Sequence, residues 1–276
     1  MRFVRYGEPG HERPGVLDAA GALRDLSSVV SDLSGDVLTE LPQVDPETLP
    51  HVDGSPRLGV PVGQVGKFIG IGLNYSDHAA EAGMEPPAMP IVFMKATSSL
   101  SGPNDPVYLP RGSEKSDWEV ELGVVIGKRA KYVSEQEALK HVAGYCVVND
   151  VSERAFQTER VGQWTKGKSC DTFGPVGPWL VTPEAAGDPQ SLALSLDLNG
   201  RRVQSGTSSA MIFTVAQIIA HLSEMMSLNP GDIIATGTPP GVGMGMKPPR
   251  FLAEGDVMEL EIEGLGRQRQ EVRRDP

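Results

Sequence analysis

The apolar residues of this chain fall in short runs that glycine and proline interrupt. Short apolar runs and strict apolar–polar alternation are both typical of β-strands. The dipeptide Asn199–Gly200 favours a tight hairpin after one of these runs. We therefore expect strands at residues 1–5, 14–17, 22–26, 67–72, 91–95, 107–109, 118–126, 144–149, 192–198, 233–236 and 257–263.

Helical patterns are fewer than strand patterns. We expect helices at 74–83 (opening near Ser76 or Asp77), 134–141, 152–160 and 214–226. Ser134 with Glu137, and Thr214 with Gln217, have the spacing of capping boxes at two of these starts. The chain shows no regular βαβ alternation, so the pattern predicts a strand-rich, mixed α/β fold and excludes a helical bundle.

The first sixty residues differ from the remainder. The stretch 36–51 is polar and contains three prolines, whereas the clearest strand and helix patterns begin at Lys67. We expect a small N-terminal domain at 1–60 and a catalytic domain at 61–276. The length of 276 residues allows one or two domains.

Charge and composition limit the kinds of binding partner that we expect for this protein. The net charge of −11 disfavours binding to phosphate backbones and to anionic lipid. The chain has no apolar run near the ~20 residues of a membrane span, and its start, MRFVRYGEPG, lacks a signal-peptide core. Its two cysteines form no disulfide or zinc framework. We expect a cytoplasmic protein that binds neither nucleic acid nor membrane.

Two acidic residues interrupt the cleanest predicted strand. Trp118, Val120 and Leu122 point to one face of the strand, so Glu119 and Glu121 project together from the other. Adjacent carboxylates repel one another unless a cation neutralises them, and Mg²⁺ or Ca²⁺ prefers oxygen ligands. The alternative is a solvated strand face.

A third carboxylate ends the next predicted strand. Asp150 is followed by Arg154 and Gln157 at helical spacing, which favours one pocket with a cation and an amide beside the carboxylates. In the alternative, Asp150 only caps the helix, with Glu153 completing a capping box.

His78 and Glu81 are three residues apart in the first predicted helix. A carboxylate beside an imidazole raises its basicity, so this pair can take a proton from water. The motif lacks the second histidine of a zinc-protease helix. An exposed polar helix face is the alternative.

Two further segments could contact a substrate. Lys168 is flanked by Gly167 and Ser169, although the segment lacks the glycine spacing of a phosphate loop. Gly237 and Thr238 follow a predicted strand and offer an N–H and a hydroxyl to a substrate carboxylate. A tight turn is the alternative at the second site.

These motifs, taken in order, resemble the fumarylacetoacetate hydrolase family over about 67–264. The family implies a β-roll flanked by helices, a homodimer, and bound Mg²⁺, or Mn²⁺ or Ca²⁺ in some members. The matching segments are W-E-V-E-L at 118–122, N-D at 149–150, R-A-F-Q at 154–157, G-K-S at 167–169 and G-T-P-P-G-V-G at 237–243.

The resemblance also implies roles for the candidate residues. Ile71 stands where larger members carry a further aspartate ligand, so fumarylacetoacetate itself is a less favoured substrate. The implied roles are metal ligation by Glu119, Glu121 and Asp150; water activation by His78 and Glu81; oxyanion stabilisation by Lys168 or Gln157; and substrate binding by Arg154, Gln157, Gly237 and Thr238.

The segments 153–179 and 236–249 resemble a subgroup that cleaves 2,4-diketo-3-deoxy sugar acids. This implies a hydrolase of carbon–carbon bonds that releases pyruvate and a second acid. Ureidoglycolate lyase and oxaloacetate decarboxylase activities on the same metal site are alternatives. A non-catalytic, metal-dependent sugar-acid binder is a further alternative, which the presence of both His78 and Glu81 disfavours.

Overall fold

A large, twisted β-sheet positions the candidate residues. The structure is a computed structural model that describes residues 1–81 and 85–275, without the side chains of residues 78–80. Within those residues the main sheet has the strand order β3-β2-β1-β12-β10-β9-β15-β4-β5, and β6 pairs beside β12. Its strands are β1 (Arg2–Tyr6), β2 (Arg13–Leu17), β3 (Leu23–Asp25), β4 (Phe68–Gly72), β5 (Ile91–Lys95), β6 (Leu100–Ser101), β9 (Val120–Ile126), β10 (Val142–Asn149), β12 (Gly174–Val181) and β15 (Ile233–Ala235).

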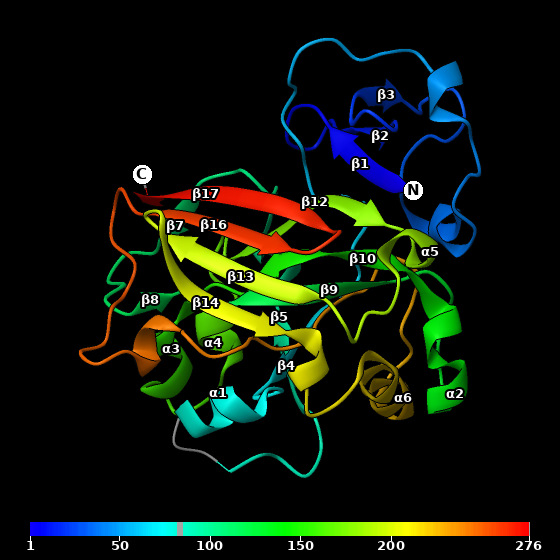
Figure 1. Ribbon diagram of the computed structural model, residues 1–276. Coiled ribbons are helices and arrows are strands. Elements are labelled where there is room, and N and C mark those ends of the chain that lie inside the picture. The colour runs from blue at the N-terminus through cyan, green and yellow to red at the C-terminus, as the bar shows by residue number, and fades with distance from the viewer. Residues whose placement is uncertain (82–84, 276) are drawn as a thin grey trace.

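A second sheet covers one face of the main sheet, as the paired layers in Figure 1 show. Its order is β14-β13-β16-β17-β7, and a separate small ladder joins β8 to β11. The hairpin predicted at Asn199–Gly200 joins β13 to β14, which confirms that prediction. The strands are β7 (Val107–Leu109), β8 (Ser116–Asp117), β11 (Ser152–Glu153), β13 (Ala193–Leu198), β14 (Arg201–Thr207), β16 (Val257–Ile262) and β17 (Gly266–Arg274).

Short helices lie mainly at one end of the two sheets (Figure 1). The α-helices are α1 (Ser76–Glu81), α2 (Glu135–Ala138), α3 (Arg154–Thr158), α4 (Thr165–Lys168), α5 (Pro183–Ala186) and α6 (Val215–Met225). Short 3₁₀ turns are at Gly35–Thr39, Pro46–Thr48, Thr97–Ser99, Leu139–His141, Ser208–Ala210 and Gly243–Gly245. No helix in the described ranges is long and apolar enough to cross a membrane.

The two capping predictions had different outcomes. Thr214 and Gln217 form the predicted capping box of α6. Ser134 makes no side-chain cap bond, so the box predicted for α2 is wrong. The predicted helix 152–160 is also too long, because Ser152 and Glu153 pair with β8 before α3 begins.

Each face of β9 has a different role. Val120, Leu122 and Val124 belong to the core between the two sheets. On the other face, Val125 and its neighbours on β10 pack against residues of the N-terminal segment. Glu119 and Glu121 lie on this second face with Val125. They lie outside the apolar cluster, at the end of the strand that the N-terminal segment does not cover.

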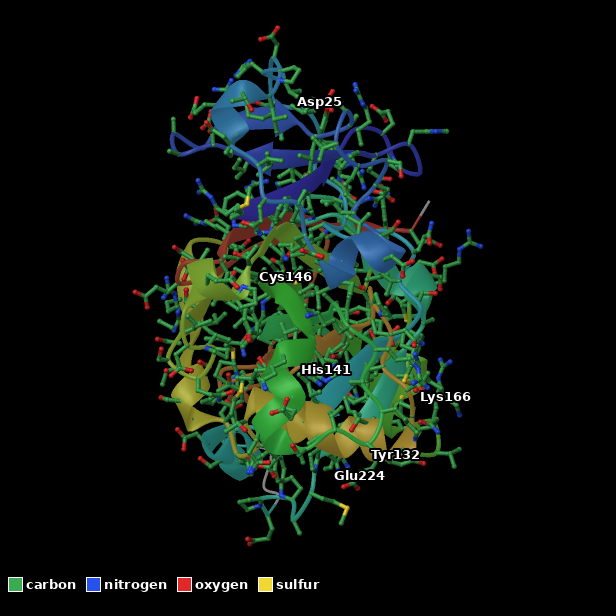
Figure 2. All side chains as sticks on the ribbon, turned by 90° about the vertical axis from the view of Figure 1, so that its right-hand side faces the viewer. Asp25, Tyr132, His141, Cys146, Lys166 and Glu224 are labelled. Atoms are coloured by element: carbon green, nitrogen blue, oxygen red, sulfur yellow. The ribbon has the colours of Figure 1, made fainter. Side chains whose placement is uncertain are left out.

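The N-terminal strands continue the main sheet, because β1 pairs antiparallel with β12. Figure 2 shows Asp25 in this N-terminal part and Cys146 in the strands beside it. Cys146 is buried in the shared apolar cluster, as expected of a core residue. The division into domains at residue 60 stays a prediction, whereas the strand-rich, mixed α/β class is confirmed.

Candidate active site

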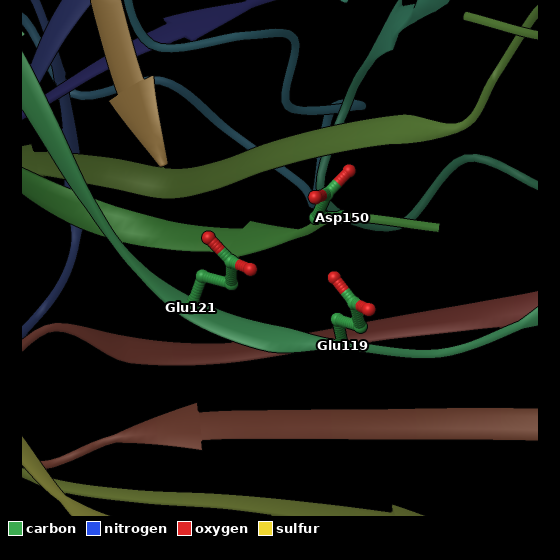
Figure 3. A group of neighbouring side chains, drawn as sticks. All are labelled: Glu119, Glu121 and Asp150. Atoms are coloured by element: carbon green, nitrogen blue, oxygen red, sulfur yellow. The ribbon is translucent and has the colours of Figure 1, made fainter. Parts of the chain in front are cut away.

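Three buried carboxylates meet where β9 begins and β10 ends (Figure 3). Glu121 lies opposite Val148 in the ladder, so Asp150, just past the end of β10, comes to lie beside Glu119 and Glu121. One oxygen of each carboxylate lies within 4.8 Å of the others. Glu119 is 5% exposed, Glu121 1% and Asp150 0%. The alternative of a solvated strand face is therefore wrong.

Two lysines neutralise part of this charge. The Nζ atom of Lys168 lies 2.6 Å from Glu119 Oε2 and 2.6 Å from Asp150 Oδ2. The Nζ atom of Lys95 lies 2.5 Å from Asp150 Oδ1. Burial lowers the pKa of Lys95, whereas for Lys168 the charges of Asp150 and Glu119 outweigh burial and raise the pKa.

Glu121 has a different environment. Its Oε2 accepts a 2.7 Å hydrogen bond from the Gly237 N–H. Among the residues that the structure describes, no lysine or arginine forms an ion pair with Glu121. Burial, followed by the charges of Asp150 and Glu119, raises the pKa of Glu121 well above its usual range. This carboxylate is the member of the triad that most needs a cation.

Arg154 joins the triad to a fourth carboxylate that sequence reasoning missed. Its Nη2 lies 2.7 Å from Glu119 Oε1, and its Nε donates to Asp117 Oδ2 at 2.9 Å. Its Nη1 donates to Gln157 Oε1 at 3.1 Å, which orients the amide of Gln157 in the same pocket.

Asp117 also accepts from the N–H groups of Gly243 and Met244, so it holds the loop after β15. The side chain of Glu153, and not that of Asp150, caps α3. The capping alternative for Asp150 is therefore wrong.

Glu81 is docked on the same loop. Its two carboxylate oxygens accept from the Gly241 N–H at 3.1 and 3.2 Å. A Cβ atom at Gly245 would lie 2.5 Å from Glu81 Cδ, so a larger residue there would require the Glu81 side chain to shift. His78 is in α1, but its side chain lies outside the described part of the structure. The dyad therefore stays a prediction.

Gly237 and Thr238 already have partners within the protein. The Gly237 N–H donates to Glu121, and the Thr238 hydroxyl donates to Val120 O at 2.9 Å. The same hydroxyl accepts from Gln204 Nε2 at 2.8 Å. These bonds hold the loop against β9 beside the triad. Binding of a substrate carboxylate at Gly237 and Thr238 stays a prediction.

A cavity of about 100 Å³ lies beside the triad, with Glu119 and Glu121 in its wall. Its polar wall includes Glu119, Glu121, Arg154, Gln157, Lys168 and Thr238. Its apolar wall includes Phe93 and Trp164, whose ring centroids are 5.7 Å apart. The rings lie over Gly70 and Gly72, where a Cβ atom would collide with them.

The cluster fits a hard divalent cation. All three converging ligands are carboxylates, which suit Mg²⁺, Mn²⁺ or Ca²⁺ better than a softer metal. Four carboxylates and three basic groups make up the site, so its net charge is −1 when all are ionised. The carboxylates are Glu119, Glu121, Asp150 and Asp117, and the basic groups are Lys95, Lys168 and Arg154. A divalent cation would reverse that sign and favour an anionic substrate.

Two site residues, Lys95 and Asp117, were not predicted. Lys95 lies opposite Phe68 in the β4–β5 ladder, on the same sheet face as Phe93. A lysine on the same strand face as a buried aromatic residue is a signal that sequence reasoning could have used. Asp117 lies next to Trp118, just before the two glutamates, but a single aspartate there is also common in turns.

Comparison with known proteins gives a consistent result. The family model described as fumarylacetoacetate (FAA) hydrolase C-terminal matches residues 67–273. A protein from Burkholderia multivorans, named only as a hydrolase, is 62% identical to this chain over 279 residues, and the match covers 99% of each chain.

Solved structures are similar over the whole chain. A fumarylacetoacetate hydrolase from Exiguobacterium antarcticum has a TM-score of 0.90 at 36% identity, with 100% of both chains covered. A maleylpyruvate hydrolase from Sphingobium sp. SYK-6 has a TM-score of 0.82 at 28% identity, again with 100% of both chains covered. A probable 2-hydroxyhepta-2,4-diene-1,7-dioate isomerase from Mycobacterium abscessus has a TM-score of 0.83 at 34% identity, with the same coverage.

Proposed function

The chain belongs to the fumarylacetoacetate hydrolase family, and we propose that it hydrolyses a carbon–carbon bond in a 2,4-diketo acid to give pyruvate and a second acid. The observation that carries this proposal is the buried triad Glu119, Glu121 and Asp150. Two of its members, Glu119 and Glu121, line a cavity together with Lys168 and Arg154. The similarity to a maleylpyruvate hydrolase supports an oxo-acid substrate.

We propose Mg²⁺ as the resident metal, held by the three carboxylates of the triad, with Mn²⁺ or Ca²⁺ as substitutes. When bound, such a cation supplies Lewis-acid stabilisation of negative charge that develops on the keto acid. The protein restrains two of these three ligands, because Lys95 holds Asp150 and Arg154 holds Glu119.

The remaining chemistry belongs to side chains around the cavity. His78, supported by Glu81, takes a proton from water, and the resulting hydroxide attacks the C4 carbonyl. Lys168 and Gln157 line the cavity and donate to the oxyanion that forms there. The C3–C4 bond then breaks with its electron pair going to C3. Protonation of C3 gives pyruvate, and C4 leaves as the second carboxylic acid.

Within this class we propose a 2,4-diketo-3-deoxy sugar acid as substrate. The support is the resemblance of 153–179 and 236–249 to enzymes with that activity. The paired rings of Phe93 and Trp164 form an apolar side of the cavity, so the substrates tested should also include acylpyruvates with apolar acyl groups.

Pyruvate release is the expected result of the direct test. The enzyme with added Mg²⁺ should release pyruvate from at least one 2,4-diketo acid, measured by coupling to lactate dehydrogenase. EDTA should abolish release, and excess Mg²⁺ should restore it, because the triad is the cation site. Pyruvate added directly in EDTA controls for the coupling enzyme.

Other outcomes would contradict the hydrolase assignment. Release of urea and glyoxylate from ureidoglycolate would favour a lyase. Loss of CO₂ from oxaloacetate, with no cleavage of any diketo acid, would favour a decarboxylase. Metal-dependent binding of a sugar acid without turnover would favour the non-catalytic binder.

We further propose that the chain forms a homodimer, as the family resemblance implies. Light scattering at micromolar concentration should give a mass near twice the 29.5 kDa of one chain. A stable species at the mass of one chain would contradict the dimer. The measurement should be made with and without Mg²⁺, so that the assembly is separated from metal binding.

A further inference from the structure

Asp150 is held by two lysines in different surroundings. Lys168 contacts Oδ2 and lines the cavity, whereas Lys95 contacts Oδ1 and is not among the residues of the cavity wall. The side chain of Lys95 is fully buried, with an exposed fraction of 0%. The two carboxylate oxygens of Asp150 therefore differ, because Oδ2 contacts a lysine of the cavity wall and Oδ1 contacts a lysine outside that wall.

Several contacts fix the position of Lys95. Its Nζ also donates to Val151 O at 3.2 Å and lies 5.7 Å from the centre of the Phe68 ring. The strand pairing of β4 and β5 places Lys95 opposite Phe68. A lysine held by strand pairing, a carbonyl and an aromatic ring cannot follow Asp150 if that carboxylate rotates, so it holds Oδ1 at one place.

We propose that Lys95 is a positioning residue that makes Asp150 a monodentate metal ligand. It retains Oδ1 and leaves only Oδ2 for the cation, so that a metal displaces Lys168 and not Lys95. This inference rests on the metal site of the proposed function. Its consequence is metal selectivity, because Mg²⁺ requires near-octahedral geometry whereas Ca²⁺ accepts bidentate carboxylates and higher coordination numbers.

The test is the ratio of Ca²⁺ to Mg²⁺ affinity in the Lys95→Met variant, measured by calorimetry on the full-length protein. Methionine fills a similar volume but cannot hold Oδ1, so Asp150 becomes free to bind through both oxygens. Relative affinity should shift toward Ca²⁺ by about tenfold, the usual size of an outer-shell effect on a metal. Loss of the lysine charge affects both divalent cations alike and cancels in the ratio.

Two further variants separate positioning from charge and from stability. Lys95→Gln keeps an N–H donor but no charge, so its ratio should stay near that of the wild type. Lys67→Met is the matched control. The Nζ atom of Lys67 lies 2.7 Å from Oδ2 of the buried Asp232, and this pair is not part of the triad. This variant should lower stability and leave the ratio unchanged.

Equal changes of both affinities in Lys95→Met would overturn the proposal and leave Lys95 as a neutralising charge. If Lys95→Met does not fold, Lys95→Gln still tests the proposal. A shift of its affinity ratio toward Ca²⁺ would show that an N–H donor at this position does not hold Oδ1. No substrate enters these measurements. A chain that cleaves no diketo acid but shows the expected ratios would contradict the proposed reaction and support the role of Lys95.

Discussion

Replacing Glu121 by glutamine should abolish metal binding and activity while making the metal-free protein more stable. Glu121 is buried, has two carboxylates beside it, and forms no ion pair with any basic residue that the structure describes. Its raised pKa means that folding disfavours the ionised form, so near neutral pH this group opposes folding. Glutamine removes that charge and can still accept from the Gly237 N–H.

The matched comparison is Glu119→Gln. Glu119 lies two residues away on the same strand face, but it pairs with Lys168 and Arg154. Its replacement should also remove metal, yet it should destabilise the metal-free protein, because two buried cations lose a partner. The two variants should therefore show the same loss of activity and opposite changes in stability.

Thermal unfolding in EDTA and in saturating Mg²⁺ measures both effects. In EDTA we expect the Tm of Glu121→Gln to exceed that of the wild type by about 2–4 °C for each kcal/mol gained. In Mg²⁺ the wild type should gain stability by mass action and the variant should not. Calorimetric titration with Mg²⁺ should detect no binding to either variant. If the Tm of Glu121→Gln in EDTA were below that of the wild type, the ionised Glu121 would have to be stabilised by other groups of the protein, which would contradict the prediction.

Sequence patterns were sufficient for the part of the site that lies on one strand. The alternation of Trp118, Glu119, Val120 and Glu121 predicts two carboxylates on one face, and the structure has them there. Asp150 follows the next strand along the chain, and that strand is also the neighbour in space. Local periodicity and sequential strand pairing together predict the triad.

The cations around the triad could not be predicted in the same way. Lys95 and Asp150 are separated by 55 positions in the chain, and three strands lie between β5 and β10 in the sheet order. They meet because the sheet curves back, so that β6, which follows Lys95, pairs with β12 beside β10. Asp117 is close to Glu119 in sequence, but its role depends on Arg154 and on the loop at Gly243. Such contacts follow from topology and not from spacing.

Two of the long strands that the sequence analysis missed, β12 and β17, have an unusual composition. The β12 segment, G-P-V-G-P-W-L-V, contains the residues that usually interrupt strands. The β17 segment, G-R-Q-R-Q-E-V-R-R, is mostly polar, although Gln268, Gln270 and Val272 alternate as its buried positions. Buried glutamines satisfied by hydrogen bonds replace the apolar residues on which the sequence reading relied.

Replacing His78 by alanine should lower kcat by about 10² to 10⁴-fold, the usual contribution of a general base, and leave Mg²⁺ affinity unchanged. The expectation follows from the proposed proton transfer, which needs His78 in the transition state and not in metal binding. Glu81→Gln should have a similar but smaller effect. Glutamine can still accept from the Gly241 N–H, so α1 stays docked while the charge that supports the imidazole is lost.

Asp77→Asn is the matched control for this last prediction. Asp77 is on the same short helix, but it is exposed and hydrogen-bonds to Ser76. Its replacement should leave kcat within about twofold of the wild type, as expected of a surface change. Initial rates and Mg²⁺ titrations on the three variants separate loss of the base from loss of the helix. Near wild-type kcat in His78→Ala would show that another group activates the water. The Glu81→Gln variant would then show whether that group is Glu81.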